Sequence, residues 1–376
     1  MAADRQLIIG VVLARTGRLA PLGEPVDFVA DLLAPKLRAG LVGIPIEIAV
    51  RDSASTVAGA RAATERLITE DGARIVITVG GSAVLPAVAG TCHRLGTPCV
   101  STTLPWQVYR DSCPPSDRAF HFCWGLDDVA SVFADMWERA AGRTTVGCLW
   151  NDGSQGRALR EDRCGFLPVA RLRGHDVVHQ PAYSEGTADF AAQVETFRDV
   201  AVITSAASAS DLGAFLDRAT ESGLRPALVT CSRWLTYPFW RGRHELDGVA
   251  TIVSWTPSHR YLSTVDGSTP AQLASAYELA TGRPWAQPLG LAYAVFEIAA
   301  HALAAAADPD DPAAVADAVR TLRLDTMAGR FDLSGGPAPG IARIALAGGQ
   351  WQGDRRLSVV RSRIPAVAPD AALVTR

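Results

Sequence analysis

Short apolar runs alternate with amphipathic helical segments from residue 7 almost to the end of this chain. Leu7–Leu13 is a continuous apolar run, and Ile44–Arg51 alternates apolar and polar residues with a period of two. Such runs are followed by segments in which apolar residues recur at helical spacing, as in Val57–Ile68. Strands that alternate with helices form parallel sheets covered by helices on both faces. The pattern therefore predicts an α/β protein with doubly wound parallel sheets.

The alternation forms two series of similar size, the first over residues 7–101 and the second over 144–231. A chain of 376 residues is long enough for two lobes with separate cores. Because no low-complexity linker separates the series, we expect lobes joined by several short crossings, an arrangement that makes a cleft with a hinge. The remaining strands are expected at 74–79, 98–101, 144–150, 176–181, 200–204, 227–231 and 248–255, and the remaining helices at 25–39, 83–95, 157–173, 187–198, 210–222, 270–281, 288–307 and 312–322.

Charge and the N-terminus limit the partners of the protein. The net charge is −3 and basic residues are scattered, which argues against binding to nucleic acid or an anionic membrane surface. The first apolar run is too short to span a membrane and has neither the basic region nor the cleavage site of an export signal. The chain is therefore either cytoplasmic or the mature form of an exported protein.

The seven cysteines allow two interpretations. Their number is odd and no C-x-x-C spacing occurs, which argues against a structural zinc site. Cys113 and Cys123 flank a Pro-Pro turn and could close a short disulfide loop. The alternative is that most of the thiols are small buried hydrophobic groups.

Motifs that would indicate an enzyme are incomplete. Gly80–Val84 resembles a nucleophile elbow, but valine replaces the second glycine that the strained turn requires. Neither a G-x-G-x-x-G loop after a strand nor a P-loop occurs, and His244 lacks a second histidine one turn later. His121 and Cys123 share one face of a strand, where core packing is a better explanation than metal binding. We expect no catalytic residues, no cofactor and no metal.

Two loops carry polar groups at the carboxyl edge of the first predicted sheet, where ligands of open α/β sheets bind. Gly80-Gly81-Ser82 follows a strand and opens a helix, so backbone N–H groups, the helix dipole and a hydroxyl favour an anion there. The alternative for Ser82 is a simple helix N-cap. The next strand ends in Ser101–Trp106, which places hydroxyls beside an indole, and the alternative for Trp106 is packing within the lobe.

With these features, several segments together resemble the leucine/isoleucine/valine-binding family of type I periplasmic binding proteins, which serve branched-chain amino acid ABC transporters. Ile9–Glu24 is similar to the family's opening strand and its "TG…A..G" loop, and Arg51–Leu67 to the "D..s.p..a...a..L" segment. The order and spacing of the motifs extend the resemblance over nearly the whole chain. The other similar segments are Ser82 with Pro98, Trp124–Asp128, Tyr183–Phe190 and Thr326–Asp332.

The resemblance implies two interleaved lobes joined by three hinge crossings, with the ligand between them. Lobe 1 would consist of residues 1–124 and 255–329, and lobe 2 of residues 125–254 and 330–376. We expect the chain to cross for the last time near Gly329–Phe331, from lobe 1 into lobe 2, which sets the last of these boundaries.

The resemblance also places ligand-binding residues in both lobes. In lobe 1 they are Ser82, Thr102, Thr103, Leu104 and Trp106, of which the serine and the stretch 102–104 would hold a carboxylate. In lobe 2 they are Gln155, Ser205, Ser208 and Arg233. Independently of the resemblance, Trp234 together with Trp106, Tyr237 and Trp240 puts aromatic surface near the expected cleft, where a ligand ring could stack, so Trp234 is a further expected contact. The acidic residue that pairs with an amino acid's ammonium in relatives falls near Ser232 or Arg233, where the sequence has no carboxylate. This departure from the family argues against an α-amino acid as the ligand, while the resemblance itself keeps a branched-chain amino acid as the alternative.

These observations predict a solute-binding protein of an ABC uptake transporter that captures a small carboxylate, either an aromatic or apolar acid or a branched-chain amino acid. The expected partners are this ligand and a membrane permease, with no nucleic acid, and the protein is expected to be a monomer. The resemblance and the cysteine count place it in the periplasm or anchored to the cell surface, with an export signal upstream of residue 1. Alternatives are a ligand sensor of the same fold that acts with a signalling partner, and a serine-dependent hydrolase.

Overall fold

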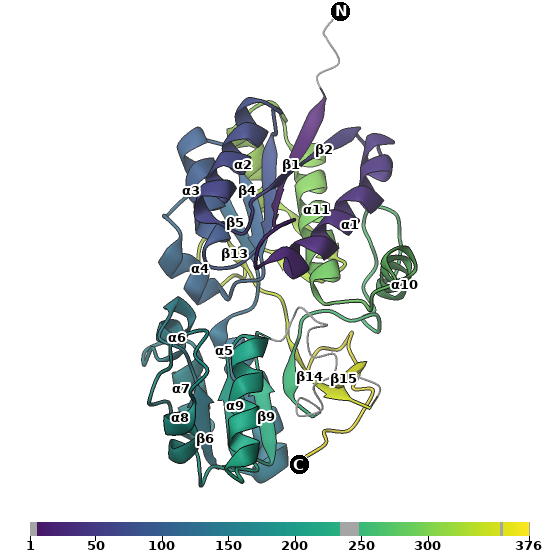
Figure 1. Ribbon diagram of the computed structural model, residues 1–376. Coiled ribbons are helices and arrows are strands. Elements are labelled where there is room, and N and C mark those ends of the chain that lie inside the picture. Colours follow the sequence, from purple (N-terminus) through teal and green to yellow (C-terminus); the bar gives the residue numbers. More distant parts are fainter. Residues whose placement is uncertain (1–5, 234–247, 354–355, 376) are drawn as a thin grey trace, which may run out of the picture. The chain divides into compact units, whose positions relative to one another are not determined.

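A computed structural model describes residues 6–233, 248–353 and 356–375. The chain divides into two compact units, and it passes between them three times (Figure 1). Met1–Trp124 and Trp255–Ile344 form lobe 1, whereas Gly125–Ser254 and Ala345–Arg376 form lobe 2. The predicted boundary at residue 329 is too early, because the strand at Ile341–Ala342 still pairs with the sheet of lobe 1. The predicted α/β class with two lobes of mainly parallel sheet is confirmed.

The sheet of lobe 1 has six strands in the order β13-β5-β4-β3-β1-β2, and every pair in it is parallel. From β1, which lies next to the edge strand β2, the chain moves to β2 on one side and later to β3 on the other. The order therefore reverses between β1 and β3, which is where open α/β sheets bind ligands. The strands are β1 (Leu7–Leu13), β2 (Ile46–Asp52), β3 (Ile75–Val79), β4 (Cys99–Thr102), β5 (Ala119–Phe122) and β13 (Ile341–Ala342).

Helices cover this sheet in two pairs. α2 and α3 pack against each other and against β1 to β5, while α1 and α11 pack against each other and against β1 and β3. By length and composition α11 could cross a membrane, but 83% of it is buried inside the protein, and it is the central core helix of this lobe. The helices are α1 (Ala20–Arg38), α2 (Val57–Thr69), α3 (Val84–Leu95), α4 (Trp106–Ser112), α10 (Pro270–Thr281), α11 (Pro288–Ala305) and α12 (Pro312–Thr321), and a two-stranded sheet joins β11 (Arg323–Thr326) to β12 (Gly329–Asp332).

Lobe 2 has a seven-stranded sheet in the order β15-β14-β10-β9-β8-β6-β7. It is parallel from β10 to β7, and the C-terminal strands β14 and β15 extend it in antiparallel fashion. Here the order reverses between β6 and β8. The strands are β6 (Thr145–Leu149), β7 (Asp176–Val178), β8 (Val202–Ser205), β9 (Leu228–Cys231), β10 (Ala250–Val253), β14 (Ala347–Gln352) and β15 (Arg356–Arg361), and the helices are α5 (Leu126–Ala141), α6 (Ser154–Leu159), α7 (Phe166–Leu172), α8 (Ala191–Thr196) and α9 (Ala209–Glu221).

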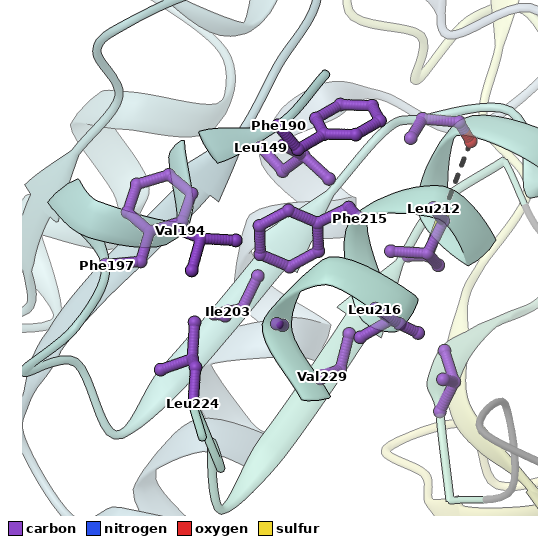
Figure 2. Packing of buried hydrophobic residues seen from close by; sticks show 14 of the residues in the cluster. Leu149, Phe190, Val194, Phe197, Ile203, Leu212, Phe215, Leu216, Leu224 and Val229 are labelled. Carbon is purple, nitrogen blue, oxygen red and sulfur yellow. Dashed lines mark hydrogen bonds between the residues drawn. The ribbon is translucent and has the colours of Figure 1, made fainter. Parts of the chain in front are cut away.

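Apolar side chains from α8, α9 and the strands beneath them form one core of lobe 2 (Figure 2). Phe215 lies at its centre, with ring centroids 5.9 Å from Phe190 and 6.2 Å from Phe197. These rings cover Leu149 and Ile203, which lie on the strands next to the reversal point. The core therefore holds β6 and β8, and the loops that follow them, in place.

Three local expectations are wrong. The helix expected at 157–173 is divided into α6 and α7, since residues 160–165 are not helical and Gly165, which precedes α7, adopts φ +89°. The Arg160 side chain donates to the carbonyls of Trp150 and Asn151. The helix expected to begin at Pro25 begins at Ala20 instead. Cys113 and Cys123 form no disulfide: all seven cysteines are free, and five of them are buried, as the alternative interpretation predicted.

Candidate functional site

The candidate site in each lobe is the carboxyl edge of its parallel sheet. We call the loops that follow β1, β2, β3 and β4 the lobe 1 edge, and the loops that follow β6, β7, β8 and β9 the lobe 2 edge. In open α/β sheets the loops next to the point of reversed strand order form the ligand crevice. Those loops follow β1 and β3 in lobe 1, and β6 and β8 in lobe 2.

Ser82 lies at the lobe 1 edge, between β3 and α3, and is exposed. The N-cap residue of α3 is Ala83, and no side chain caps this helix. The first turn closes instead on the Gly81 carbonyl, which accepts from the N–H groups of Val84 at 3.1 Å and Leu85 at 3.0 Å. The interpretation of Ser82 as a plain helix cap is therefore wrong. Its hydroxyl lies at a helix N-terminus, where the helix dipole favours a negative charge.

Thr103, directly after β4, joins two loops of the lobe 1 edge. Its hydroxyl oxygen lies 2.8 Å from the Gly80 carbonyl oxygen and accepts from the Gly80 N–H at 3.1 Å. Its φ is +81°, a left-handed conformation that β-branched residues rarely adopt. Such strain persists only where the surroundings enforce it, commonly at functional sites.

The other predicted residues of this stretch point into the lobe. Thr102 is fully buried, and its hydroxyl donates to the Phe122 carbonyl at 2.6 Å. The Leu104 carbonyl accepts from the His121 ring at 2.6 Å. Trp106 begins α4 with 7% of its surface exposed, and the Arg110 guanidinium lies 5.2 Å from its ring centre. Thr102, Leu104 and most of Trp106 thus support the edge from within.

The loops after β1 and β2 form a polar cluster that was not identified from the sequence. Asp52 accepts from the Arg15 N–H at 2.9 Å and from the Thr16 hydroxyl at 2.7 Å. The Ser55 hydroxyl donates to the Thr16 carbonyl at 2.6 Å. Burial raises the pKa of Asp52, but these hydrogen bonds to the carboxylate outweigh it and lower the pKa overall. The segments around Thr16 and Asp52 carried the family resemblance, which was the available signal.

At the lobe 2 edge Gln155 follows β6. It lies in the first turn of α6 and is half-buried. Asn151 shapes the approach to this helix, because its side-chain oxygen accepts from the Gly153 N–H at 3.1 Å. Asn151 also bridges to Tyr183, which fixes the loop after β7 beside the loop after β6.

Ser205 and Ser208 use their hydroxyls within lobe 2. Ser205 is 2% exposed, donates to the Leu149 carbonyl at 3.2 Å and accepts from the Ala207 N–H at 2.9 Å. Ser208 is the N-cap of α9 and accepts from the Asp211 N–H at 3.2 Å. Both serines shape the loop after β8 at the reversal point.

A carboxylate does lie beside Arg233, contrary to the sequence-based expectation. Glu185, from the loop after β7, has an oxygen 2.9 Å from Arg233 Nη1, with 40% and 26% of the two side chains exposed. The same guanidinium nitrogen is 3.4 Å from the Ala206 carbonyl oxygen. The ion pair thus joins the loops after β7, β8 and β9. Trp234, and Tyr237 and Trp240 beyond it, lie outside the described residues.

Two further polar side chains at this edge were not identified from the sequence. Asp211 is 2% exposed and accepts from the Gly186 N–H at 3.2 Å, and Tyr183 is 4% exposed. Burial, together with the nearby Asp211, raises the pKa of the Tyr183 hydroxyl. The tyrosine therefore stays neutral at physiological pH.

Chemically, the two edges offer hydroxyls, amides, backbone groups, the Asp52 carboxylate and ion pairs such as that of Arg233 with Glu185. Among the described residues, no group of three His, Cys, Asp or Glu side chains is placed to hold a metal ion. The hydrogen-bonded pair Ser101 and His121 is 2% and 0% exposed, so the serine is closed to a substrate. Groups of this kind suit the binding of a small polar solute.

Comparisons with known proteins agree with this architecture. The sequence profile of a family described as "Periplasmic binding protein" matches residues 6–350. No curated protein matches the chain. A leucine-binding protein from Thermotoga maritima has a similar structure, with a TM-score of 0.76, 16% identity, and coverage of 94% of this chain and 97% of that one.

Two other solved structures are similar over nearly their whole length. A leucine-, isoleucine-, valine-, threonine- and alanine-binding protein from Brucella ovis has a TM-score of 0.78 at 16% identity, covering 99% of this chain and 95% of that one. An ABC transporter solute-binding protein from R. palustris, solved with benzoate, has a TM-score of 0.74 at 17% identity, covering 98% and 99%. At these identities the likeness shows a shared fold.

Proposed function

The chain belongs to the periplasmic binding protein family, and from this premise we propose that it is the extracytoplasmic solute-binding component of an ABC uptake transporter. It captures a small carboxylate with an aromatic or apolar body between its two lobes and releases it chemically unchanged.

The observation that carries the carboxylate assignment is the state of Ser82. Its exposed hydroxyl lies at the N-terminus of α3 but does not cap the helix. A serine that does not satisfy its own helix is available for a ligand anion, and the helix dipole adds attraction. Thr103, whose hydroxyl is joined to the loop before Ser82, contributes a second polar group. Ser82 follows β3, next to the point of reversed strand order, in agreement with the general rule for this sheet type, and Thr103 contacts the same loop through Gly80.

The aromatic or apolar part of the ligand, beyond its carboxylate, is assigned from the charges of lobe 2 and from the ligands of the similar structures. A zwitterionic amino acid needs a carboxylate for its ammonium, because a buried unpaired charge is costly. Glu185 lies at this edge but is engaged by Arg233. Proteins with this fold include one solved with benzoate and others named for leucine, so the fold accommodates both kinds of solute. Trp106, and Trp234 outside the described residues, are the aromatic side chains we propose to contact the ligand.

Calorimetric titration with benzoate, 4-hydroxybenzoate, phenylalanine and leucine tests the ligand class. We expect the two benzoates to bind and the two amino acids to bind weakly or not at all. A thermal-shift experiment should agree, because a ligand that binds only the folded state raises the melting temperature. Tight binding of leucine without a response to either benzoate contradicts the assignment.

Ligand is proposed to close the lobes by rotation about the three crossings. Contacts of one solute with both lobes favour the closed state through its higher affinity. Small-angle scattering should therefore show a smaller radius of gyration at saturating benzoate. The benzoate recovered afterwards should be unaltered, and its consumption at an enzyme-like rate would refute a purely binding role.

The proposed partner is a membrane permease, and the proposed location is the periplasm or the outer face of the cell membrane, with the protein acting as a monomer. Permease and ATPase genes next to the gene for this chain would support transport, and genes for a signalling partner would support sensing. Fractionation of the native cells provides a direct test, since recovery of the protein in the cytosol contradicts the proposed location.

A further inference from the structure

His121 connects three parts of lobe 1 although it is 0% exposed. Its Nδ1 lies 2.8 Å from the Ser101 hydroxyl on the neighbouring strand β4, and its Nε2 lies 2.6 Å from the Leu104 carbonyl beyond that strand. Its ring stacks on Tyr109 of α4, with centroids 4.0 Å apart and planes inclined by 3°. Both nitrogens of this buried ring are therefore paired, and they join β5 to β4 and to the loop after β4.

These partners fix the tautomer of the ring. A carbonyl oxygen only accepts, so Nε2 carries the proton that is donated to Leu104. Nδ1 of the neutral ring is then an acceptor, and the Ser101 hydroxyl donates to it. Burial lowers the pKa of His121 to about 4, so the ring is neutral at physiological pH.

The backbone next to this contact is strained. Thr103 has φ +81° and lies between Thr102, which is hydrogen-bonded to β5 at 2.6 Å, and Leu104, which is held by His121. A β-branched residue stays in the left-handed region only where its surroundings enforce that conformation, and the bonds of Thr102 and Leu104 hold both flanks of Thr103, whose hydroxyl bonds to Gly80. The bond from Ser101 in turn keeps the ring in the tautomer that donates to Leu104.

We propose that His121 is a positioning residue of the ligand site: its Nε2–H holds the Leu104 carbonyl and thereby fixes Thr103 in the geometry required at the lobe 1 edge. The inference rests on the proposed function, because it takes Thr103 to be a ligand contact. A buried side chain on the neighbouring strand β5 would thus control the position of the Thr103 ligand contact.

The matched variants His121→Gln and His121→Asn separate positioning from core packing. Both remove the ring that stacks on Tyr109. The glutamine amide reaches about as far as Nε2 and can still donate to Leu104, whereas the shorter asparagine amide stands where Nδ1 was and leaves the carbonyl unpaired. If His121 only packs in the core, the two variants behave alike.

Amide hydrogen exchange of the segment 102–108 is the first measurement, and it requires no ligand. We expect exchange within about twofold of wild type in His121→Gln, and about tenfold faster in His121→Asn, the effect of one lost buried hydrogen bond. Benzoate affinity should fall about tenfold in His121→Asn and stay near wild type in His121→Gln. Equal exchange in the two variants overturns the proposal, and so does full benzoate affinity in a His121→Asn protein whose loop exchanges faster.

Wild-type protein gives a test that does not depend on the folding of a variant. Nitrogen NMR of His121 should show a single Nε2-protonated tautomer that persists to about pH 5. Protonation on Nδ1 instead would overturn the proposal. If wild type fails to bind benzoate or any related acid, the proposed ligand class is refuted, while exchange and NMR still decide whether His121 holds the loop.

Discussion

Ser82→Ala and Thr56→Ala form a matched pair that distinguishes a ligand contact from a helix cap. Both residues are exposed hydroxyl side chains that precede a helix of lobe 1. Thr56 is the N-cap of α2 and accepts from the Gly59 N–H at 3.0 Å. Ser82 caps nothing, because α3 has no side-chain cap. One substitution should therefore reduce stability and the other should reduce affinity.

The magnitudes follow from what each hydroxyl does. Loss of a threonine N-cap costs about 1 kcal/mol, which corresponds to a fall in melting temperature of roughly 2–4 °C in a domain of this size. Loss of a hydrogen bond to a ligand carboxylate costs about 1.5–3 kcal/mol, or about tenfold to a hundredfold in affinity. We expect Ser82→Ala to bind benzoate at least about tenfold more weakly with an unchanged melting temperature, and Thr56→Ala to show the reverse.

Calorimetric titration gives the affinities, and thermal unfolding without ligand gives the stabilities. A Ser82→Ala protein that is destabilised as much as Thr56→Ala, and that binds benzoate like wild type, would refute the reasoning. Ser82 would then contribute only to the start of α3. If neither substitution changes affinity or stability, the position of Ser82 has no role in ligand binding.

Three further predictions concern stability. Burial raises the pKa of Glu297 from 4.5 to about 7, so between these pH values the folded state keeps a proton that the unfolded chain has lost. The free energy of unfolding should therefore fall by up to about 3 kcal/mol as pH rises through this window. Urea titrations at pH 5 and pH 8 should show this fall in wild type and not in Glu297→Gln. Burial would raise the pKa of Asp135, but hydrogen bonds from three arginines outweigh this effect and lower the pKa below 3.8, so the stability that Asp135 contributes is lost as pH falls below that value. Asp135→Asn should reduce the free energy of unfolding at pH 7 by about 1–3 kcal/mol. Its free energy of unfolding should also fall less than that of wild type when the solution is acidified. A Cβ on Gly290 would lie 2.2 Å from the Trp255 ring, whereas one on Gly335 would meet nothing within 4 Å. In urea unfolding, Gly290→Ala should therefore reduce the free energy of unfolding by about 1–3 kcal/mol and Gly335→Ala should leave it unchanged. Equal stability of the two variants would contradict this packing.

The architecture of each lobe could be predicted from the sequence because its signals are periodic and local. Alternation with a period of two in Ile44–Arg51 and helical spacing in Val57–Ile68 correspond to β2 and α2. Local patterns predict the ends of helices and strands less well. The helix expected at 157–173 is divided where Gly165 adopts φ +89° and where the Arg160 side chain bonds to carbonyls about ten residues earlier, and hydrophobic periodicity contains neither signal.

The candidate site could be placed but not resolved from the sequence. Ser82 and Thr103 fall at a sheet edge because they follow apolar runs, which is a local signal. Whether a serine caps its helix depends on which backbone group closes the first turn, and at α3 that group is the Gly81 carbonyl. The sequence therefore left two roles open for Ser82, and the backbone geometry removed one of them.

The sequence by itself determined the α/β class, the order of the elements and the sheet edges that carry the candidate site, because hydrophobic periodicity is set by neighbours a few residues apart. Only the tertiary structure decided that Glu185 meets Arg233 and that His121 holds Leu104. The partners in these contacts are 48 and 17 residues apart in the chain. They meet only because strand register and helix packing bring separate loops to one edge, and no local pattern encodes that approach.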